Sequence, residues 1–343
     1  MVNKMTTIPI NTTRQMKQKN IMLVASTLKS LSSATKGDIS AQTGLSLATC
    51  GTILNELCSK GEIIEESIDE SRGGRPAKRY IYNSNYFSIL SIYIEGNDTS
   101  GVISSSLRSA DGKTIVEHDK IYTDLTEDTL LAKIQEFADK FSNIKAIGLG
   151  LPGVIVDGKI LTCDITCLEG LAITELLSNR FGVFVQVGND MNYTAFGFYR
   201  NHCRNINEPI AYVFMPPRHC AGCGIVISGK MLRGASQFAG EVSKLPFYDN
   251  LGSKINSHYE LVQQRLIYIT SSLIAMINPV TIAISGEHIS QNCIAELSAQ
   301  LLKKFDCKHI PRFVYRDDIK YDYHNGISEY TLDAYNNFRV FEI

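Results

Sequence analysis

Two adjacent polar residues, Asn189 and Asp190, have the clearest capacity for chemistry in this sequence. They follow the β-forming run 183–187, and residues just past the end of a strand commonly face the ligand in α/β proteins. A carboxylate there can accept hydrogen bonds from two hydroxyl groups and can also take up a proton. The alternative is structural, because Asn and Asp are also common N-caps of helices.

A glycine-rich segment, residues 221–230, could bring backbone N–H groups close to phosphate oxygens. Gly222 and Gly224 would belong to such a loop, although most glycine-rich turns are only turns. Cys220 and Cys223 have the spacing of metal ligands, but the sequence offers no second ligand pair near them. We therefore expect no metal at this segment.

The N-terminal residues carry a different pattern, which suits DNA. Apolar residues recur at helical spacing over 13–30, a short helix is expected over 36–43, and Ser46 is a good N-cap for a third helix that ends near Ser59. Two helices joined by a tight turn at Gly44 make a helix-turn-helix. Small polar side chains on the exposed side of the third helix can approach bases and phosphates, and we assign this role to Ser46, Thr49, Thr52 and Asn55.

A basic loop follows the third helix. The β-forming segments 62–68 and 80–82 flank the sequence Arg-Gly-Gly-Arg-Pro-Ala-Lys-Arg, which resembles the wing of a winged helix. Its cations are Arg72, Arg75, Lys78 and Arg79, and such a loop could enter a narrow minor groove, where the negative potential is enhanced. A solvated charged hairpin is the alternative. The order of three helices and a basic hairpin favours a winged helix-turn-helix DNA-binding domain over residues 1–83.

The composition fits a small nucleic-acid module joined to a larger body. Residues 1–83 hold 11 Lys and Arg against 7 Asp and Glu, whereas the remaining 260 residues hold 23 against 28. A chain of 343 residues suffices for two or three domains. It has no apolar run near the roughly 20 residues that span a bilayer. With no signal-peptide pattern and nine scattered Cys, we expect a cytoplasmic protein with reduced thiols.

Beyond residue 83 the segments alternate between strands and helices. Strands are expected over 86–94, 101–107, 145–150 and 183–187, with helices over 128–141, 171–181 and 193–199. A second series of segments begins near residue 210. This order predicts an α/β body with a mixed sheet.

The order of these segments resembles the ROK family of repressors, open reading frames and sugar kinases. The resemblance rests on the basic loop, Leu-Pro-Gly at 151–153, Gly-Asn-Asp at 188–190, Gly-Glu at 240–241 and Asn-Pro-Val-Thr-Ile-Ala-Ile-Ser-Gly at 278–286. It implies a two-lobed, actin-like (ribonuclease H-like) ATPase and sugar-kinase fold behind the winged helix-turn-helix. The lobes would span 84–201 and 202–343, with the C-terminal helix packed back on the first lobe. It also implies a sugar site made by Asn189, Asp190, Glu241 and Glu260.

The sequence departs from the family's kinases at two places. The kinases open with an Asp-x-Gly-Gly-Thr phosphate loop, but the corresponding stretch here begins Tyr93-Ile94-Glu95, and the charge of Glu95 would repel a triphosphate. We therefore expect Gly222 and Gly224 to be a vestigial phosphate loop, with no cofactor and no kinase activity. Lys244 stands where family members have a zinc-binding His, and no Cys lies between Cys223 and Cys293, so we expect the zinc site to be lost.

Three functions remain possible at this stage. The favoured one is a transcriptional regulator of carbohydrate metabolism, most simply a repressor, that binds a double-stranded DNA operator and senses a sugar or sugar phosphate. The others are a ligand-independent DNA-binding protein that uses its body to dimerise, and an active sugar kinase. Because one winged helix contacts only a short half-site, we expect a homodimer or a higher homo-oligomer. No membrane partner is expected.

Overall fold

The computed structural model describes residues 13–66, 78–97, 100–203, 205, 207–216, 220–247 and 259–341. Its backbone contacts divide the chain into two compact units. Unit 1 comprises residues 1–88, 108–115 and 332–343, and unit 2 comprises residues 89–107 and 116–331. The chain therefore enters unit 1 three times, and the expected boundaries at residues 83 and 201 stay predictions.

Unit 1 is built from three helices and a small sheet. The helices are α1 (Thr13–Leu31), α2 (Lys36–Thr43) and α3 (Leu47–Ser59), and they confirm the helices expected from the sequence. The antiparallel sheet has the order β1-β3-β2, with β1 (Ser33–Thr35), β2 (Ile63–Glu66) and β3 (Arg79–Tyr82). Caps set the helix starts, because Thr35 and Asp38 form a capping box at α2 and the Ser46 hydroxyl accepts the Thr49 N–H at α3.

The end of the C-terminal helix, α10 (Lys320–Phe341), belongs to unit 1. The Arg339 guanidinium donates from Nη1 and Nη2 to the two carboxylate oxygens of Glu62, at 2.7 and 2.6 Å, and the Tyr82 hydroxyl donates to Glu62 at 2.9 Å. The Glu62 side chain is only 2% exposed and that of Arg339 14%. This buried bidentate pair holds the residue just after α3 to the last turns of α10.

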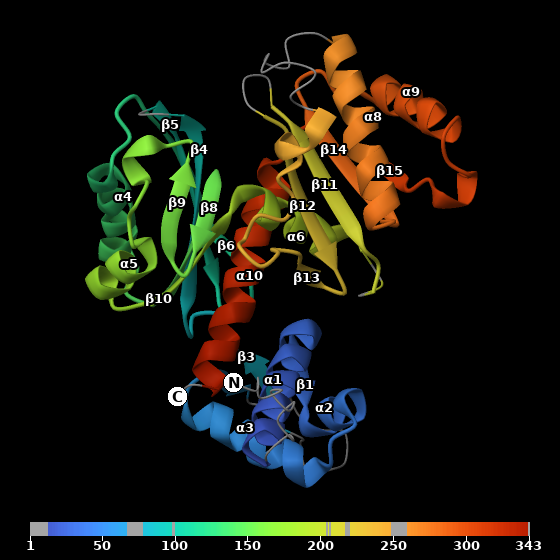
Figure 1. Cartoon of the computed structure of the whole chain (residues 1–343). Helices are drawn as coiled ribbons and strands as arrows, with labels where there is room; N and C mark the ends of the chain where they lie inside the picture. Colours follow the sequence, from blue (N-terminus) through green and yellow to red (C-terminus); the bar gives the residue numbers. More distant parts are fainter. Residues whose placement is uncertain are drawn as a thin grey trace, which may run out of the picture. The chain divides into compact units, whose positions relative to one another are not determined.

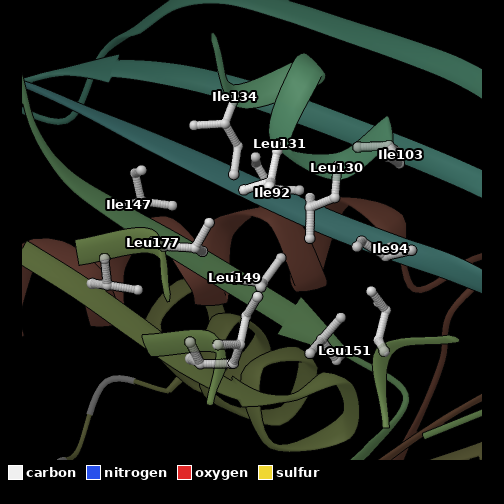
Figure 2. Packing of buried hydrophobic residues seen from close by; sticks show 14 of the residues in the cluster. Ile92, Ile94, Ile103, Leu130, Leu131, Ile134, Ile147, Leu149, Leu151 and Leu177 are labelled. Carbon is white, nitrogen blue, oxygen red and sulfur yellow. The ribbon is translucent and has the colours of Figure 1, made fainter. Parts of the chain in front are cut away.

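The first large sheet of unit 2 has the strand order β10-β7-β4-β5-β6. Its strands are β4 (Ser88–Asn97), β5 (Ser100–Ser109), β6 (Thr114–Tyr122), β7 (Ile144–Leu151) and β10 (Phe184–Asn189), and β10 runs parallel to β7. The helices α4 (Glu127–Lys140) and α5 (Ile173–Phe181) contribute Leu130, Ile134 and Leu177 to a core shared with Ile92 and Ile147 (Figure 2). A separate ribbon, β8 (Gly153–Val156) and β9 (Lys159–Cys163), is followed by the short helix η1 (Thr166–Leu168).

The second large sheet has the order β13-β12-β11-β14-β15. It comprises β11 (Ile210–Met215), β12 (Gly222–Ile227), β13 (Lys230–Met231), β14 (Thr281–Gly286) and β15 (Arg312–Tyr315), with β14 parallel to both neighbours. Helices α8 (Tyr259–Met276) and α9 (Gln291–Leu302) cover one face (Figure 1), and the short helices η2 (Val242–Lys244) and η3 (Cys307–His309) lie in its connections. The expected α/β body with mixed sheets is confirmed.

Helices α6 (Asp190–His202) and α10 cross in direct backbone contact within unit 2. A Cβ atom on Gly197 would lie 1.9 Å from the carbonyl oxygen of Asp322, and one on Gly326 would lie 1.8 Å from that of Tyr193. Only glycine permits this approach. The crossing fixes the start of α6, where Asp190 stands. No helix among the described residues is both long and apolar enough to cross a membrane.

Candidate functional site

The exposed side of α3 carries the side chains expected to contact DNA. Cys50, Ile53, Leu54 and Leu57 form its buried face, as the helical spacing predicts. Ser46, Thr52 and Asn55 are exposed and Thr49 is half-buried. Gly44, in the left-handed conformation with φ of 72°, ends α2 and allows the tight turn into α3. The four candidate residues therefore lie on one accessible stretch that starts at the helix N-terminus, where N–H groups attract anions.

Lys78, at the end of the basic loop, is engaged in an ion pair. Its ammonium group lies 2.7 Å from the Glu65 carboxylate, and both side chains are exposed to water. Such surface pairs contribute little stability, so Lys78 could exchange Glu65 for a phosphate. Arg72 and Arg75, two further cations of the basic loop, lie outside the described residues.

Asn189 and Asp190 stand where β10 passes into α6, as the sequence predicts. The Asn189 side chain is the N-cap of α6: its Oδ1 accepts the Asn192 N–H at 3.0 Å, and its Nδ2 donates to the Gly153 carbonyl at 3.0 Å. Asn189 therefore has the structural role of a helix N-cap, which was the alternative to a ligand contact. Asp190 is the first helical residue, and its carboxylate accepts the Met191 N–H at 2.7 Å.

The carboxylates of Asp164 and Glu241 interact electrostatically with that of Asp190, and we call these three groups the carboxylate cluster. The pKa of Asp190 is raised to about 7, mainly by burial, with the Met191 N–H opposing the rise and the charges of Asp164 and Glu241 adding to it. Burial also raises the pKa of Glu241, with Lys244 opposing and Asp164 adding to the shift. Like charges disfavour one another's ionised forms. The cluster thus offers several acceptors for hydroxyl groups, and it binds a proton more readily than isolated carboxylates do.

Asp164 is a member of this cluster that the sequence analysis missed. It follows β9 and the Cys163 thiol, in a turn where its N–H donates to the Pro152 carbonyl at 3.0 Å. Its place directly after a short strand, like that of Asp190, is the signal that could have found it.

Glu260 shares no interaction with the cluster among the described residues. It is exposed in the first turn of α8, whereas Glu241 caps η2. The zinc that the family resemblance implies does not fit this part of the chain, because Lys244 occupies the position of its His ligand. Within the described ranges no three His, Cys, Asp or Glu side chains could hold a metal ion.

Tyr93 is a buried residue of β4, in the stretch that corresponds to the kinases' phosphate loop. It is 4% exposed, its hydroxyl donates to Glu95 at 2.5 Å, and its ring lies 4.1 Å from that of Tyr323 and 5.5 Å from that of His324. Burial raises the pKa of Tyr93 well above its usual value, and the charges of Glu95 and Asp190 act in the same direction. An aromatic ring and a carboxylate therefore occupy the end of β4.

Gly222 and Gly224 have a packing role in β12. A Cβ atom on Gly224 would lie 2.0 Å from the Met191 carbonyl oxygen, and one on Gly222 would lie 2.6 Å from the Met191 side chain. Both glycines let α6 approach the strand closely. This geometry accounts for the glycines without a phosphate, and the vestigial phosphate loop stays a prediction.

The comparisons with known proteins point to one family. The ROK family model matches residues 101–251. A xylose repressor of Caldicellulosiruptor bescii is 25% identical over 249 residues, which cover 69% of this chain and 61% of that protein. The DNA-binding transcriptional dual regulator NagC of Escherichia coli K12 is 25% identical over 218 residues, 60% of this chain and 52% of NagC. The chain spans about three fifths of the length of the xylose repressors that it matches.

Solved structures agree on the fold. A ROK family transcriptional regulator, described as a homologue of the E. coli MLC protein, superposes with a TM-score of 0.73 at 17% identity and covers 96% of this chain and 100% of its own. A ROK hexokinase from Thermus thermophilus gives a TM-score of 0.55 at 16% identity, over 71% of this chain and 97% of its own. The fold is therefore the mixed α/β, actin-like fold of ROK sugar kinases. Residues 101–251 of this chain match the ROK family model, and the chain is similar to xylose repressors and to NagC.

Proposed function

We propose that this chain is a DNA-binding transcriptional repressor of carbohydrate metabolism whose ROK body senses a sugar. The observation that carries the proposal is the relatives' names: they are xylose repressors and the DNA-binding regulator NagC, which match 60–69% of this chain. Fold likeness alone would fit a sugar kinase equally, because kinases are also structural neighbours.

Unit 1 supplies the DNA-binding module in this proposal. The α2–Gly44–α3 arrangement and the β2–β3 pair have the order of a winged helix-turn-helix, with α3 as the recognition helix. Ser46, Thr49, Thr52 and Asn55 contact base edges and phosphates, whereas Arg72, Arg75 and Lys78 form the wing. Two such modules in a homodimer would match two operator half-sites.

The carboxylate cluster supplies the sugar sensor. Asp190, Asp164 and Glu241 accept hydrogen bonds from sugar hydroxyls, and Asn189 holds the start of α6 in place. Glu260 would join them only if α8 brings it to the bound sugar. Hydroxyl donors stabilise the ionised form of Asp190, so sugar binding favours loss of its proton.

We infer that the body does not phosphorylate its sugar. Catalysis by a kinase needs cations or N–H groups that offset the charge of the transferred phosphate. Here Tyr93 and Glu95 stand beside Asp190 instead, and Glu95 adds negative charge. Asp190 would then accept hydrogen bonds from sugar hydroxyl groups without acting as a general base.

The proposal is tested with selected genomic DNA fragments and a sugar panel. Arg75→Ala should weaken operator binding by roughly 1–3 kcal/mol, with Lys60→Ala on the exposed end of α3 as the control. A sugar that binds the wild type should change operator affinity, and Asp190→Asn should remove that change. Absence of DNA binding would refute the proposed regulator. Sugar-dependent ATP turnover by the wild type that Asp190→Asn abolishes would show that the chain is an enzyme.

A further inference from the structure

The turn that ends α3 is attached to the helix by its own backbone. Gly61 adopts the left-handed conformation with φ of 73°, and its N–H donates to the Cys58 carbonyl at 3.0 Å. The N–H of Glu62 donates to the Leu57 carbonyl at 3.0 Å. These two hydrogen bonds make a Schellman motif, which closes the last turn of a helix. Glu62 is therefore held to the end of α3, and a displacement of Glu62 displaces the helix.

The side chain of Glu62 is held from the other side by unit 1. Its carboxylate accepts both hydrogen bonds of the Arg339 guanidinium and that of the Tyr82 hydroxyl. The guanidinium in turn lies 5.8 Å from the centre of the Tyr86 ring and 5.3 Å from that of Phe87. Two coplanar hydrogen bonds and two neighbouring rings leave this guanidinium little freedom. The end of α3 is thus fixed to the last turns of α10.

The pair is too deeply buried to contact DNA itself, since Glu62 is 2% exposed and Arg339 14%. The residues expected to contact DNA, between Ser46 and Asn55, lie toward the other end of α3. The helix has 13 residues and is about 20 Å long, so a tilt of about 5° at one end moves the other by roughly 2 Å. A displacement of that size breaks hydrogen bonds to base edges.

The apolar face of α3 fixes the tilt less strictly than the ion pair does. Cys50, Ile53, Leu54 and Leu57 are held by burial, which has no preferred direction. A bidentate pair between a guanidinium and a carboxylate is directional. Apolar groups of similar volume often stabilise a fold as well as a buried ion pair does, so stability alone is a weak reason for this pair.

From this geometry we propose that Glu62 and Arg339 are positioning residues for operator recognition, which set the tilt of α3 through the turn that follows it. This role rests on the proposed function, in which α3 is the recognition helix. The last turns of α10 are then a working part of the DNA-binding module, although Arg339 lies 277 positions from Glu62. A module cut from the chain at residue 83 would lack the partner of Glu62.

The experiment compares operator affinity with affinity for any DNA. The full chain is titrated by fluorescence anisotropy with a duplex from the selected genomic fragments and with a scrambled duplex of the same length. The central variant is Glu62→Met/Tyr82→Phe/Arg339→Met, which removes one charge of each sign and so leaves the general attraction to phosphates unchanged. We expect it to bind the operator about tenfold or more weakly, and the scrambled duplex within about twofold of the wild type.

Stability is measured alongside affinity, because a loss of folding would also remove DNA binding. The thermal midpoint of the triple variant should stay within about 5 °C of that of the wild type, since both members of the buried pair are replaced together. Arg339→Lys keeps a cation beside Glu62 but loses the planar fork, and we expect its operator affinity to be intermediate. If the triple variant unfolds at the assay temperature, Arg339→Lys decides alone.

The matched control is Arg200→Met/Glu329→Met, which removes a 2.8 Å ion pair between α6 and α10 within unit 2 and also conserves net charge. It should bind both duplexes as the wild type does. Wild-type operator affinity in the folded variants of the Glu62 pair would overturn the proposal, as would equal losses on the operator and the scrambled duplex. A wild type without operator preference would refute the proposed function, and this role with it.

Discussion

Replacement of Asp190 by Asn should change how the stability of the protein depends on pH. The folded-state pKa of Asp190 is about 7, against an ordinary value of 3.8. At about 1.4 kcal/mol per pKa unit, the ionised form is disfavoured in the folded protein by up to about 4 kcal/mol. Because the Asp190 residue as a whole is half-buried, solvent screening reduces this to roughly 2 kcal/mol.

The sign follows from proton binding. The folded state holds the Asp190 proton more tightly than the unfolded state does, so this contribution to stability is complete below about pH 4 and is lost as the pH rises to about 7. The Asp190→Asn variant has no titratable group at this position, so it does not lose stability in this way as the pH rises. The variant should therefore gain stability over the wild type by roughly 2 kcal/mol between pH 4.5 and pH 8.

Urea unfolding of both proteins, followed by circular dichroism across this pH range, measures the difference. Asp128→Asn, an exposed carboxylate in the first turn of α4, is the control and should add no such pH dependence. Asp164→Asn should shift the pH window downward, because it removes one of the charges that raise the pKa of Asp190. A difference between Asp190→Asn and wild type that stays constant with pH would refute the coupled cluster.

Three further outcomes are expected. Gly197→Ala should destabilise unit 2 by roughly 3 kcal/mol in calorimetry, because its Cβ would meet the Asp322 carbonyl; Gly37→Ala, with its nearest atom at 3.6 Å, should not. Arg339→Met should cost about 3–5 kcal/mol in urea unfolding of unit 1, because it leaves the Glu62 carboxylate buried without its cation. Lys60→Met, which breaks an exposed pair with Glu56, should cost less than about 1 kcal/mol. Light scattering should find a dimer of the 38.1 kDa chain; a monomer that still binds its operator tightly would contradict the paired-module proposal.

The sequence by itself determined the features that depend on neighbouring residues. The caps at Thr35 and Ser46, the buried face of α3 and the strand-to-helix break before Asp190 all follow from residues within a few positions of each other. Periodicity and capping act locally, so they can be read along the chain. The order of such segments also indicated the resemblance to the ROK family, whose model matches residues 101–251.

Only the tertiary structure decided the features that join distant residues. Asp164 was missed because its electrostatic effect on Asp190, 26 positions away in the sequence, arises only in the folded chain. Glu62 and Arg339, 277 positions apart, form their ion pair only after the C-terminal helix has packed. Gly222 and Gly224 suggested a phosphate loop, yet their Cα atoms lie against Met191. Whether a position requires glycine depends on which atoms pack against its Cα, and that is a property of the packed fold.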